Sequence, residues 1–367
     1  MDPTVKKLLL VAVTAALLLG PRPARACTTF MLERGGQHFV GKSYDWDKGQ
    51  GLVVINKAGV GKRALSLSTT DTPATWVSRH ASVTFNQFGR ELPNGGMNDA
   101  GLVVEVMWLD TSVFPAPDAR LAVNELQFVQ WLLDEFSSVG EVVQHAGDVR
   151  VSLIQGKVHS LACDTSGACA ALEFLDGALK VTSGPTLEVK VLTNTSYVEA
   201  LQSLHQHAGF GGKKALPKGA SSMARFARAA SLVRARAKAE PIEESFRILD
   251  AVANDSPATQ WRIVYAPEQR KVWFRTHASA KVKSVDLTKF DASCGSAVRV
   301  LDIDSPLPGE SSDRFEDYTD AANLRLVKLG LAPFLDQLPP GTDVKLAGYP
   351  SRLPCTTVPA TGSKSAR

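Results

Sequence analysis

The chain has 367 residues, of which 44% are hydrophobic and 21% are charged, and its formal net charge is +4. This composition is typical of a globular protein with a large buried core, and it excludes a disordered chain. Nothing in the charge pattern indicates a nucleic-acid ligand, and beyond the N-terminal segment no apolar run reaches the roughly 18–20 residues of a membrane helix.

The first 26 residues have the three parts of a secretory signal peptide. Lys6 and Lys7 are basic, residues 8–20 are apolar, and Ala24-Arg25-Ala26 places small residues at a cleavage site. We therefore expect a secreted or periplasmic protein that is cleaved after Ala26. Cleavage would remove four basic residues and one acidic residue, so the net charge of the mature chain would be +1.

Cleavage would make Cys27 the N-terminal residue, with a free α-amine beside its thiol. The pKa of an α-amine is about 7.7–8.0 and that of a thiol about 8.5, so the amine can accept the thiol proton near neutral pH. The position therefore favours a catalytic cysteine. The alternatives are a lipid-modified cysteine, to which Ala24 and Arg25 are poorly suited, and one half of a disulfide.

The segment after Cys27 predicts a β-hairpin. Residues 27–33 and 38–45 are rich in Thr, Phe, Val and Tyr, and Gly35-Gly36 between them is typical of a two-residue turn. Such a turn pairs Arg34 with Gln37, which fixes the register of the two strands.

This register places Thr29 opposite Lys42 and Cys27 opposite Tyr44, with all four side chains on one face. A cation at Lys42 would favour the Cys27 thiolate, and Asp45, just after the strand, would hold the α-amine. The alternative for Lys42 and Asp45 is a solvated hairpin edge.

Four cysteines remain, an even number for an exported chain. Cys163 and Cys169 flank a turn-forming stretch over 164–168 that brings adjacent strands into disulfide range. Cys294 and Cys355 then pair by elimination, which would tie the C-terminal tail to the body.

The rest of the chain predicts alternating helical and stranded blocks. Residues 120–136 have the apolar spacing of a helix, and Ser138 with Glu141 forms a capping box that opens another. Residues 150–195 are predicted as strands with a turn at Asp176-Gly177, and residues 222–253 return to helix.

The proline-rich stretch 305–309 predicts a boundary. Residues 27–305 would form the main domain, and residues 306–367 a C-terminal extension held by the Cys294–Cys355 disulfide. Within the extension, residues 316–334 predict one or two short helices, and residues 360–367 a frayed end.

Several short motifs occur in the order seen in the choloylglycine hydrolase family, which the chain resembles over residues 27 to about 290. This family of bile salt hydrolases and penicillin V acylases belongs to the N-terminal nucleophile (Ntn) hydrolases. The matching blocks are Cys27-Thr28-Thr29-Phe30, Gly41-Lys42-Ser43-Tyr44-Asp45-Trp46, Gly96-Met97-Asn98-Asp99-Ala100-Gly101-Leu102, Leu192-Thr193-Asn194, Ala224-Arg225-Phe226, Thr259-Gln260-Trp261-Arg262 and Ser284-Val285-Asp286-Leu287.

The resemblance implies an α+β fold in which two sheets lie between two layers of helices, the four-layer αββα sandwich of Ntn hydrolases. It implies that Cys27 is both nucleophile and base, and that Asp45 orients its amine. It also implies that Asn194 contributes to the oxyanion hole and that Arg225 supports the nucleophile electrostatically.

Two positions depart from the family pattern. Lys42 replaces the usual arginine, which keeps the charge but loses the planar guanidinium fork. Trp108 replaces an oxyanion-hole asparagine of the bile salt hydrolases and resembles the Gram-negative penicillin V acylases and acylhomoserine lactone acylases. A backbone N–H must then be the second oxyanion donor.

Other roles stay open for several of these residues. Asn194-Thr195-Ser196 is also a glycosylation sequon, Arg225 would fit an exposed basic helix, and Trp108 would fit the core. His205 and His207 are spaced like metal ligands, but no further ligand accompanies them, so we expect solvated loop histidines and no metal site.

Together these features predict an exported hydrolase that cleaves a linear N-acyl amide through a thioester, without a cofactor or a nucleic-acid or membrane partner. Both a monomer and a homo-oligomer remain open. The alternatives are an acyltransferase and a non-catalytic binding protein. Penicillin V, acylhomoserine lactones, conjugated bile salts and N-acyl amino acids all remain open as substrates. The residues expected to line an apolar acyl pocket are Phe30, Tyr44, Trp46, Met107 and Trp108. The alternative is that these residues belong to the hydrophobic core.

Overall fold

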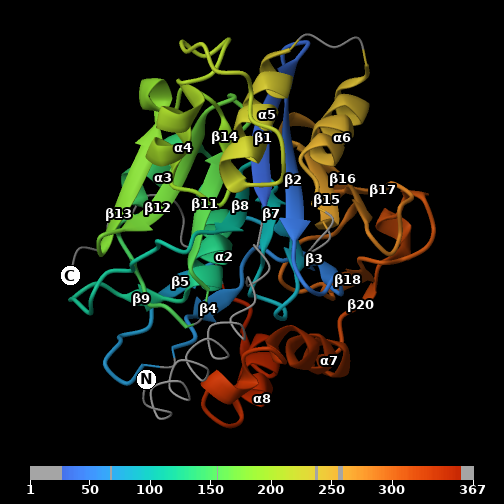
Figure 1. Cartoon of the computed structure of the whole chain (residues 1–367). Coiled ribbons are helices and arrows are strands. Elements are labelled where there is room, and N and C mark those ends of the chain that lie inside the picture. Colours follow the sequence, from blue (N-terminus) through green and yellow to red (C-terminus); the bar gives the residue numbers. More distant parts are fainter. Residues whose placement is uncertain (1–26, 67, 155, 236–238, 255–258, 357–367) are drawn as a thin grey trace, which may run out of the picture.

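The computed structural model describes residues 27–66, 68–154, 156–235, 239–254 and 259–356, which form two large stacked sheets (Figure 1). Within these residues the first sheet has seven strands in the order β14 (Val191–Leu192), β1 (Thr28–Arg34), β2 (Gln37–Asp45), β15 (Thr259–Ala266), β16 (Lys271–Thr276), β17 (Lys283–Asp286) and β19 (Gly309–Glu310). The second has nine in the order β13 (Ala178–Ser183), β12 (Cys169–Leu175), β11 (Val158–Cys163), β8 (Val103–Trp108), β7 (Gly95–Asn98), β6 (Ser82–Asn86), β3 (Leu52–Asn56), β18 (Arg299–Asp302) and β20 (Glu316–Asp317).

Helices cover the outer face of each sheet. The first sheet is covered by α5 (Ser222–Arg234) and α6 (Pro241–Ala251), with α4 (Tyr197–Leu204) packed on α5. The second is covered by α2 (Glu125–Glu135) and α3 (Val139–His145). The minor elements are the pairs β4 (Gly61–Arg63) with β5 (Thr75–Val77) and β9 (Ala122–Val123) with β10 (Arg150–Val151), and the 3-10 helices η1 (Gly184–Thr186), η2 (Pro267–Gln269), η3 (Leu287–Lys289), η4 (Ser312–Arg314), η5 (Leu335–Gln337) and η6 (Pro350–Arg352).

Hydrophobic cores fill the spaces between these layers. Between the sheets, the ring of Phe85 contacts those of Tyr265 and Phe274, with centroids 6.0 and 5.4 Å apart. A second core joins the outer face of the nine-stranded sheet to α2 and α3. The arrangement is therefore the predicted αββα sandwich. None of the described helices is long and apolar enough to cross a membrane.

The predicted hairpin register is confirmed. Arg34 lies opposite Gln37 and Thr29 opposite Lys42, and both turn glycines have positive φ. Cys27 lies immediately before β1 rather than within it. The turn at Asp176-Gly177 also joins two strands as predicted.

Two predicted helix boundaries were wrong, and in each case a capping signal explains the difference. The helix predicted over 120–136 begins at Glu125, because the Asn124 side chain accepts hydrogen bonds from the backbone N–H groups of Leu126 and Gln127. The stretch 222–253 contains two helices, and Pro241 is at the start of the second, where its missing N–H costs nothing.

The close packing of β1 on β2 gives a prediction about stability. A Cβ atom at Gly41 would lie 2.3 Å from Cζ of Phe30, whose ring is fully buried. We expect Gly41→Ala to lower the free energy of unfolding by about 1–3 kcal/mol, measured by urea denaturation. Gly140→Ala in α3, where the nearest atom lies 3.8 Å away, is the control and should not destabilise the protein. Equal losses in both variants would contradict this packing.

The chain continues beyond the predicted boundary at residue 305 into both sheets and then into two further helices. β19 pairs with β17, and β20 with β18. α7 (Asp320–Leu331) and α8 (Thr342–Ala347) follow and lie together at one end of the sheet stack (Figure 1).

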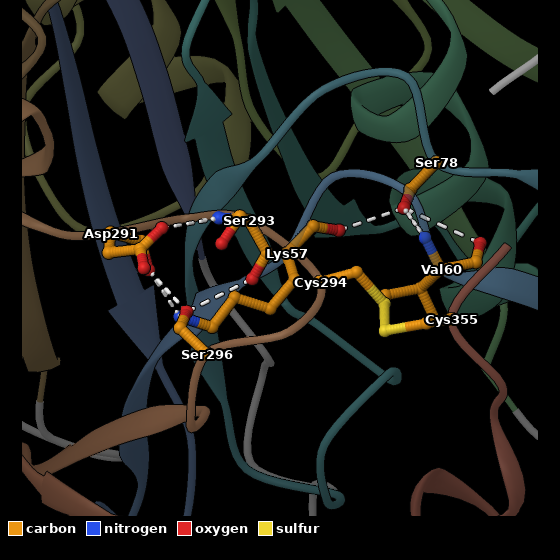
Figure 2. Close-up of a disulfide and its surroundings, with 8 residues drawn as sticks. All are labelled: Lys57, Val60, Ser78, Asp291, Ser293, Cys294, Ser296 and Cys355. Carbon is orange, nitrogen blue, oxygen red and sulfur yellow. Dashed lines mark hydrogen bonds between the residues drawn. A yellow bond between two sulfur atoms is a disulfide. The ribbon is translucent and has the colours of Figure 1, made fainter. Parts of the chain in front are cut away.

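Both predicted disulfides are present, Cys163–Cys169 between β11 and β12 and Cys294–Cys355 across a separation of 61 residues. Figure 2 shows the second disulfide beside residues 57–60, where Lys57 Nζ donates to the Asp291 carbonyl at 2.6 Å. The C-terminal segment is thus covalently attached to the body.

Candidate active site

Cys27 lies at the entry to β1 with a free thiol that is only 3% exposed. The disulfide alternative for this residue is therefore wrong. Burial raises the pKa of the Cys27 thiol, the positive charge of Lys42 lowers it, and the Asp45 carboxylate raises it again. A backbone hydrogen bond from Asp45 and the charge of Arg225 favour the thiolate to a smaller degree.

Arg225 is buried in α5 and holds the chain around Cys27. Its NH1 donates to the Cys27 carbonyl at 2.6 Å and to Thr28 Oγ1 at 2.7 Å, and its NH2 donates to Asn194 Oδ1 at 2.9 Å. The exposed-helix alternative for Arg225 is therefore wrong. A planar guanidinium is well suited to bind several acceptors at fixed angles.

The Asn194 side chain connects Arg225 on α5 to the end of β8. Its Oδ1 accepts from Arg225, and its Nδ2 donates to the Trp108 carbonyl at 2.8 Å. Its backbone N–H donates to Ser222 Oγ at 2.9 Å. Because an amide NH₂ carries two donors, one N–H remains to bind an oxyanion once the bond to Trp108 is made.

Asp45 ends β2 as a buried carboxylate with two strong donors. Thr259 Oγ1 donates to Oδ1 at 2.5 Å, and Asn254 Nδ2 donates to Oδ2 at 2.9 Å. Burial nevertheless dominates and raises the pKa of Asp45 from 3.8 to about 6. Sequence reasoning missed Asn254, which comes from the turn after α6 and has no motif around it.

Lys42 belongs to a buried charged group that the sequence did not predict. Its Nζ lies 3.6 Å from Glu105 Oε2 and also donates to the Val106 carbonyl, while Tyr265 OH donates to Glu105 Oε1 at 2.5 Å. Burial raises the pKa of Glu105 to about 7. Lys42 and Asp45 are almost completely buried, so the solvated-edge alternative is wrong. The signal for Glu105 was a single acidic residue in the apolar stretch 102–109.

An apolar cavity adjoins the thiol. Cys27, Tyr44, Trp46 and Trp108 line it, as expected for the last three, and Asn94 adds a polar group that was not predicted. Trp108 is therefore a cavity residue rather than a plain core tryptophan.

Two predicted pocket residues lie elsewhere. Met107 neighbours Trp108 on β8, so its side chain points to the opposite face, where its Sδ accepts from Thr29 Oγ1 at 2.9 Å. Phe30 packs over Gly41 in the core. The pocket prediction for both residues was wrong because it ignored strand alternation, and the core alternative is confirmed.

The two loop histidines have ordinary partners. His205 Nε2 lies 2.9 Å from Glu188 Oε2, and His207 Nδ1 donates to the Ala215 carbonyl at 2.7 Å. Among the described residues no group of three metal-ligating side chains is present.

The stacked sheets, their outer helices and the cysteine at the start of the first strand define an Ntn-hydrolase fold. Residues 27–300 match the family model for linear amide C–N hydrolases of the choloylglycine hydrolase family. Because this match covers most of the chain, the chain belongs to that family, and its members' activity makes it a hydrolase of carbon–nitrogen bonds in linear amides.

Three relatives illustrate the likeness. A penicillin V acylase of Pectobacterium atrosepticum is 25% identical over 354 residues, covering 82% of this chain and 90% of that protein. The structure of a penicillin V acylase from Agrobacterium tumefaciens has a TM-score of 0.68 and 25% identity, covering 80% of this chain and 98% of that one. A mutant conjugated bile acid hydrolase from Clostridium perfringens, 18% identical with a TM-score of 0.63, covers 75% of this chain and 96% of that one and shares the fold.

Proposed function

We propose that the chain is an exported enzyme that uses an N-terminal cysteine to hydrolyse a linear N-acyl amide. The N-terminus would arise by removal of residues 1–26, which lie outside the described residues. The observation that carries the proposal is the position of Cys27, whose buried thiol lines an apolar cavity and lies within electrostatic reach of Lys42, Asp45 and Arg225.

In the first half of the proposed reaction the α-amine of Cys27 accepts the thiol proton, and the thiolate attacks the carbonyl carbon of the amide. The resulting oxyanion accepts a hydrogen bond from the second N–H of Asn194. The C–N bond then breaks, and the α-ammonium gives its proton to the leaving nitrogen. The products are a free amine and a thioester on Cys27.

In the second half a water molecule attacks the thioester carbonyl, and the α-amine accepts a proton from that water. When the C–S bond breaks, this proton returns to sulfur and the carboxylic acid leaves. Asp45 would hold the amine in place throughout, since its carboxylate is fixed by Thr259 and Asn254.

The cavity supports an uncharged, apolar acyl group. Its lining is mostly apolar and includes the rings of Tyr44, Trp46 and Trp108, which bind aromatic or aliphatic groups. The one carboxylate in the described lining, Glu125, accepts hydrogen bonds from the backbone N–H groups of Ile154 and Gly156. The likeness to two penicillin V acylases supports a phenoxyacetyl group among the acceptable acyl groups. Fatty-acyl groups fit the same chemistry better than a steroid does.

The proposed role of Asp45 gives a pH dependence. Its carboxyl takes up a proton as the pH falls through about 6, and the protonated form no longer binds an ammonium group. We expect kcat/KM to fall by about tenfold per pH unit below that value. Because the pKa in the folded chain is raised, this group opposes folding at neutral pH, and the stability it costs is regained as the pH falls below 6.

The pH profile of Asp45→Asn checks this role. In that variant kcat/KM should reach a lower plateau and should show no acid limb, that is, no decrease as the pH falls through 6. Glu105→Gln should keep the acid limb. A limb that is unchanged in Asp45→Asn would assign the titration to another group.

A substrate panel tests the proposed function. The mature protein is incubated with penicillin V, an N-acylhomoserine lactone, a conjugated bile salt and an N-acyl amino acid, and the released amine is measured. We expect turnover of at least one substrate with an aromatic or aliphatic acyl group. Transfer of the acyl group to added hydroxylamine in preference to water would favour an acyltransferase, and no turnover of any substrate would favour a non-catalytic binding protein.

A further inference from the structure

One side of the cavity beside Cys27 comes from the C-terminal segment. The cavity is lined there by Leu331 at the end of α7, by Phe334 between the two helices, and by Leu346 in α8. We call these three residues the C-terminal wall. The family match ends at residue 300, so the wall lies outside it. The cavity is therefore completed by residues outside the part of the chain that matches the family model.

We infer that the C-terminal wall sets the length of the acyl group that the enzyme accepts and restricts it to short, uncharged, apolar groups. This inference rests on the proposed function, because it concerns the acyl part of the same substrate. The C-terminal wall determines specificity, whereas Cys27 and its charged neighbours carry out the reaction.

The start of the wall is fixed against the body by α7. A Cβ at Gly330 would lie 2.4 Å from the Gln87 carbonyl oxygen, so the helix approaches the 87–89 loop as closely as its backbone allows. Asn323 on α7 accepts from the Arg90 N–H at 2.8 Å and donates to the Ala347 carbonyl at 2.9 Å. One buried amide thus joins α7 both to the body and to the end of α8.

The other end of the wall is fixed by the tail that follows it. Thr356 N–H donates to the Gly59 carbonyl at 2.8 Å, and Gly61 N–H donates to the Pro354 carbonyl at 2.9 Å. Between Pro354 and Thr356, Cys355 forms the disulfide with Cys294 that Figure 2 shows. Because both ends are attached, the wall is a fixed boundary of the cavity.

The size of the cavity indicates what this boundary does. Its volume is about 90 Å³, well below the roughly 300–1,000 Å³ of typical small-molecule sites. Phe334 and Trp46 both line the cavity, their ring centroids lie 6.5 Å apart, and Phe334 is only 7% exposed. Removing this ring would extend the cavity toward α7 and α8.

Acyl-length profiles test the inference. The substrates are N-acyl amides of one amine whose acyl groups range from butanoyl to dodecanoyl. Their kcat/KM is measured for the wild type, Phe334→Ala and the milder Phe334→Leu. The control is Leu335→Ala, because the side chain of Leu335 is 40% exposed. One methylene in a hydrophobic pocket changes kcat/KM by roughly 10–200-fold. We therefore expect the dodecanoyl-to-butanoyl ratio to rise at least about tenfold in Phe334→Ala, to a smaller extent in Phe334→Leu, and not in Leu335→Ala.

Fatty-acid binding, followed by fluorescence of the cavity tryptophans, separates this inference from the proposed function. An unchanged ratio in folded, active Phe334 variants would overturn the role of the wall and leave the hydrolase intact. If the wild type hydrolyses none of the amides, the proposed function fails. The role of the C-terminal wall is then still supported if Phe334→Ala strengthens the binding of dodecanoate relative to that of butanoate. It is overturned if the relative binding does not change.

Discussion

Replacement of Cys27 by alanine is expected to abolish amide hydrolysis, with a loss in kcat on the order of 10⁴ or more. The sulfur atom of Cys27 would form the covalent intermediate, and no second free cysteine exists in the described chain to replace it. The measurement is amine release under single-turnover conditions. Because the change removes one buried sulfur atom, the thermal unfolding temperature should shift only slightly.

The serine variant provides the matched control for this prediction. Cys27→Ser keeps a nucleophilic oxygen at the same position, but a hydroxyl is a far weaker acid than a thiol, so the α-amine of a site built around a thiol activates it less effectively. We expect activity well below that of the wild type. Full activity of Cys27→Ala would show that another group performs the reaction, and full activity of Cys27→Ser would contradict the requirement for a thiol.

The second large effect is expected from Arg225→Met. The variant loses the donor that holds both the Cys27 carbonyl and Asn194 Oδ1, so the nucleophile and the oxyanion donor lose their common support. We expect kcat to fall about 10²–10³-fold, the loss typical of one misplaced oxyanion donor. The acceptors left unpaired in the interior would also cost about 1–3 kcal/mol of unfolding free energy.

A readout on the thiol separates this positioning role from simple destabilisation. Because the charge of Arg225 lowers the pKa of the Cys27 thiol, its loss should shift the pH profile of Cys27 alkylation upward. Arg225→Lys should restore part of that shift but not the hydrogen-bond geometry. Arg228→Met, one turn further along α5 with bonds to the Ala251 and Gly219 carbonyls, is the control and should leave the alkylation profile unchanged.

Local signals in the sequence were sufficient for the first hairpin. Gly35-Gly36 fixed the turn, the turn fixed the register, and alternation then placed Lys42 on the face of the nucleophile. The turn between Cys163 and Cys169 likewise identified one disulfide and left the other pair by elimination. These features depend on residues close in the chain or on a count of cysteines.

The features that sequence reasoning missed depend on packing between distant segments. Glu105 meets Lys42 only because the two sheets face each other, and Asn254 reaches Asp45 only after α6 has crossed the first sheet. The same holds for Phe334, which reaches Trp46 from a segment with no matching motif. No local sequence pattern predicts a contact between such distant segments.

The assignment of Met107 to the pocket failed for a simpler reason. Trp108 and Met107 are neighbours on one strand, so only one of them can face the cavity. Applying the two-residue period to β8 would have grouped Val106 with Trp108, which is the pair that lines the cavity.

The proposal that Cys27 is an N-terminal nucleophile is tested most directly by intact mass measurement of the purified protein, expressed from the full chain. The mass is measured before and after brief alkylation at pH 6–7, and the N-terminal peptide is mapped. A chain that begins at Cys27 and is rapidly alkylated on that residue is the predicted result. A chain that retains residues before Cys27, or in which this thiol is blocked or unreactive, would contradict the proposed mechanism.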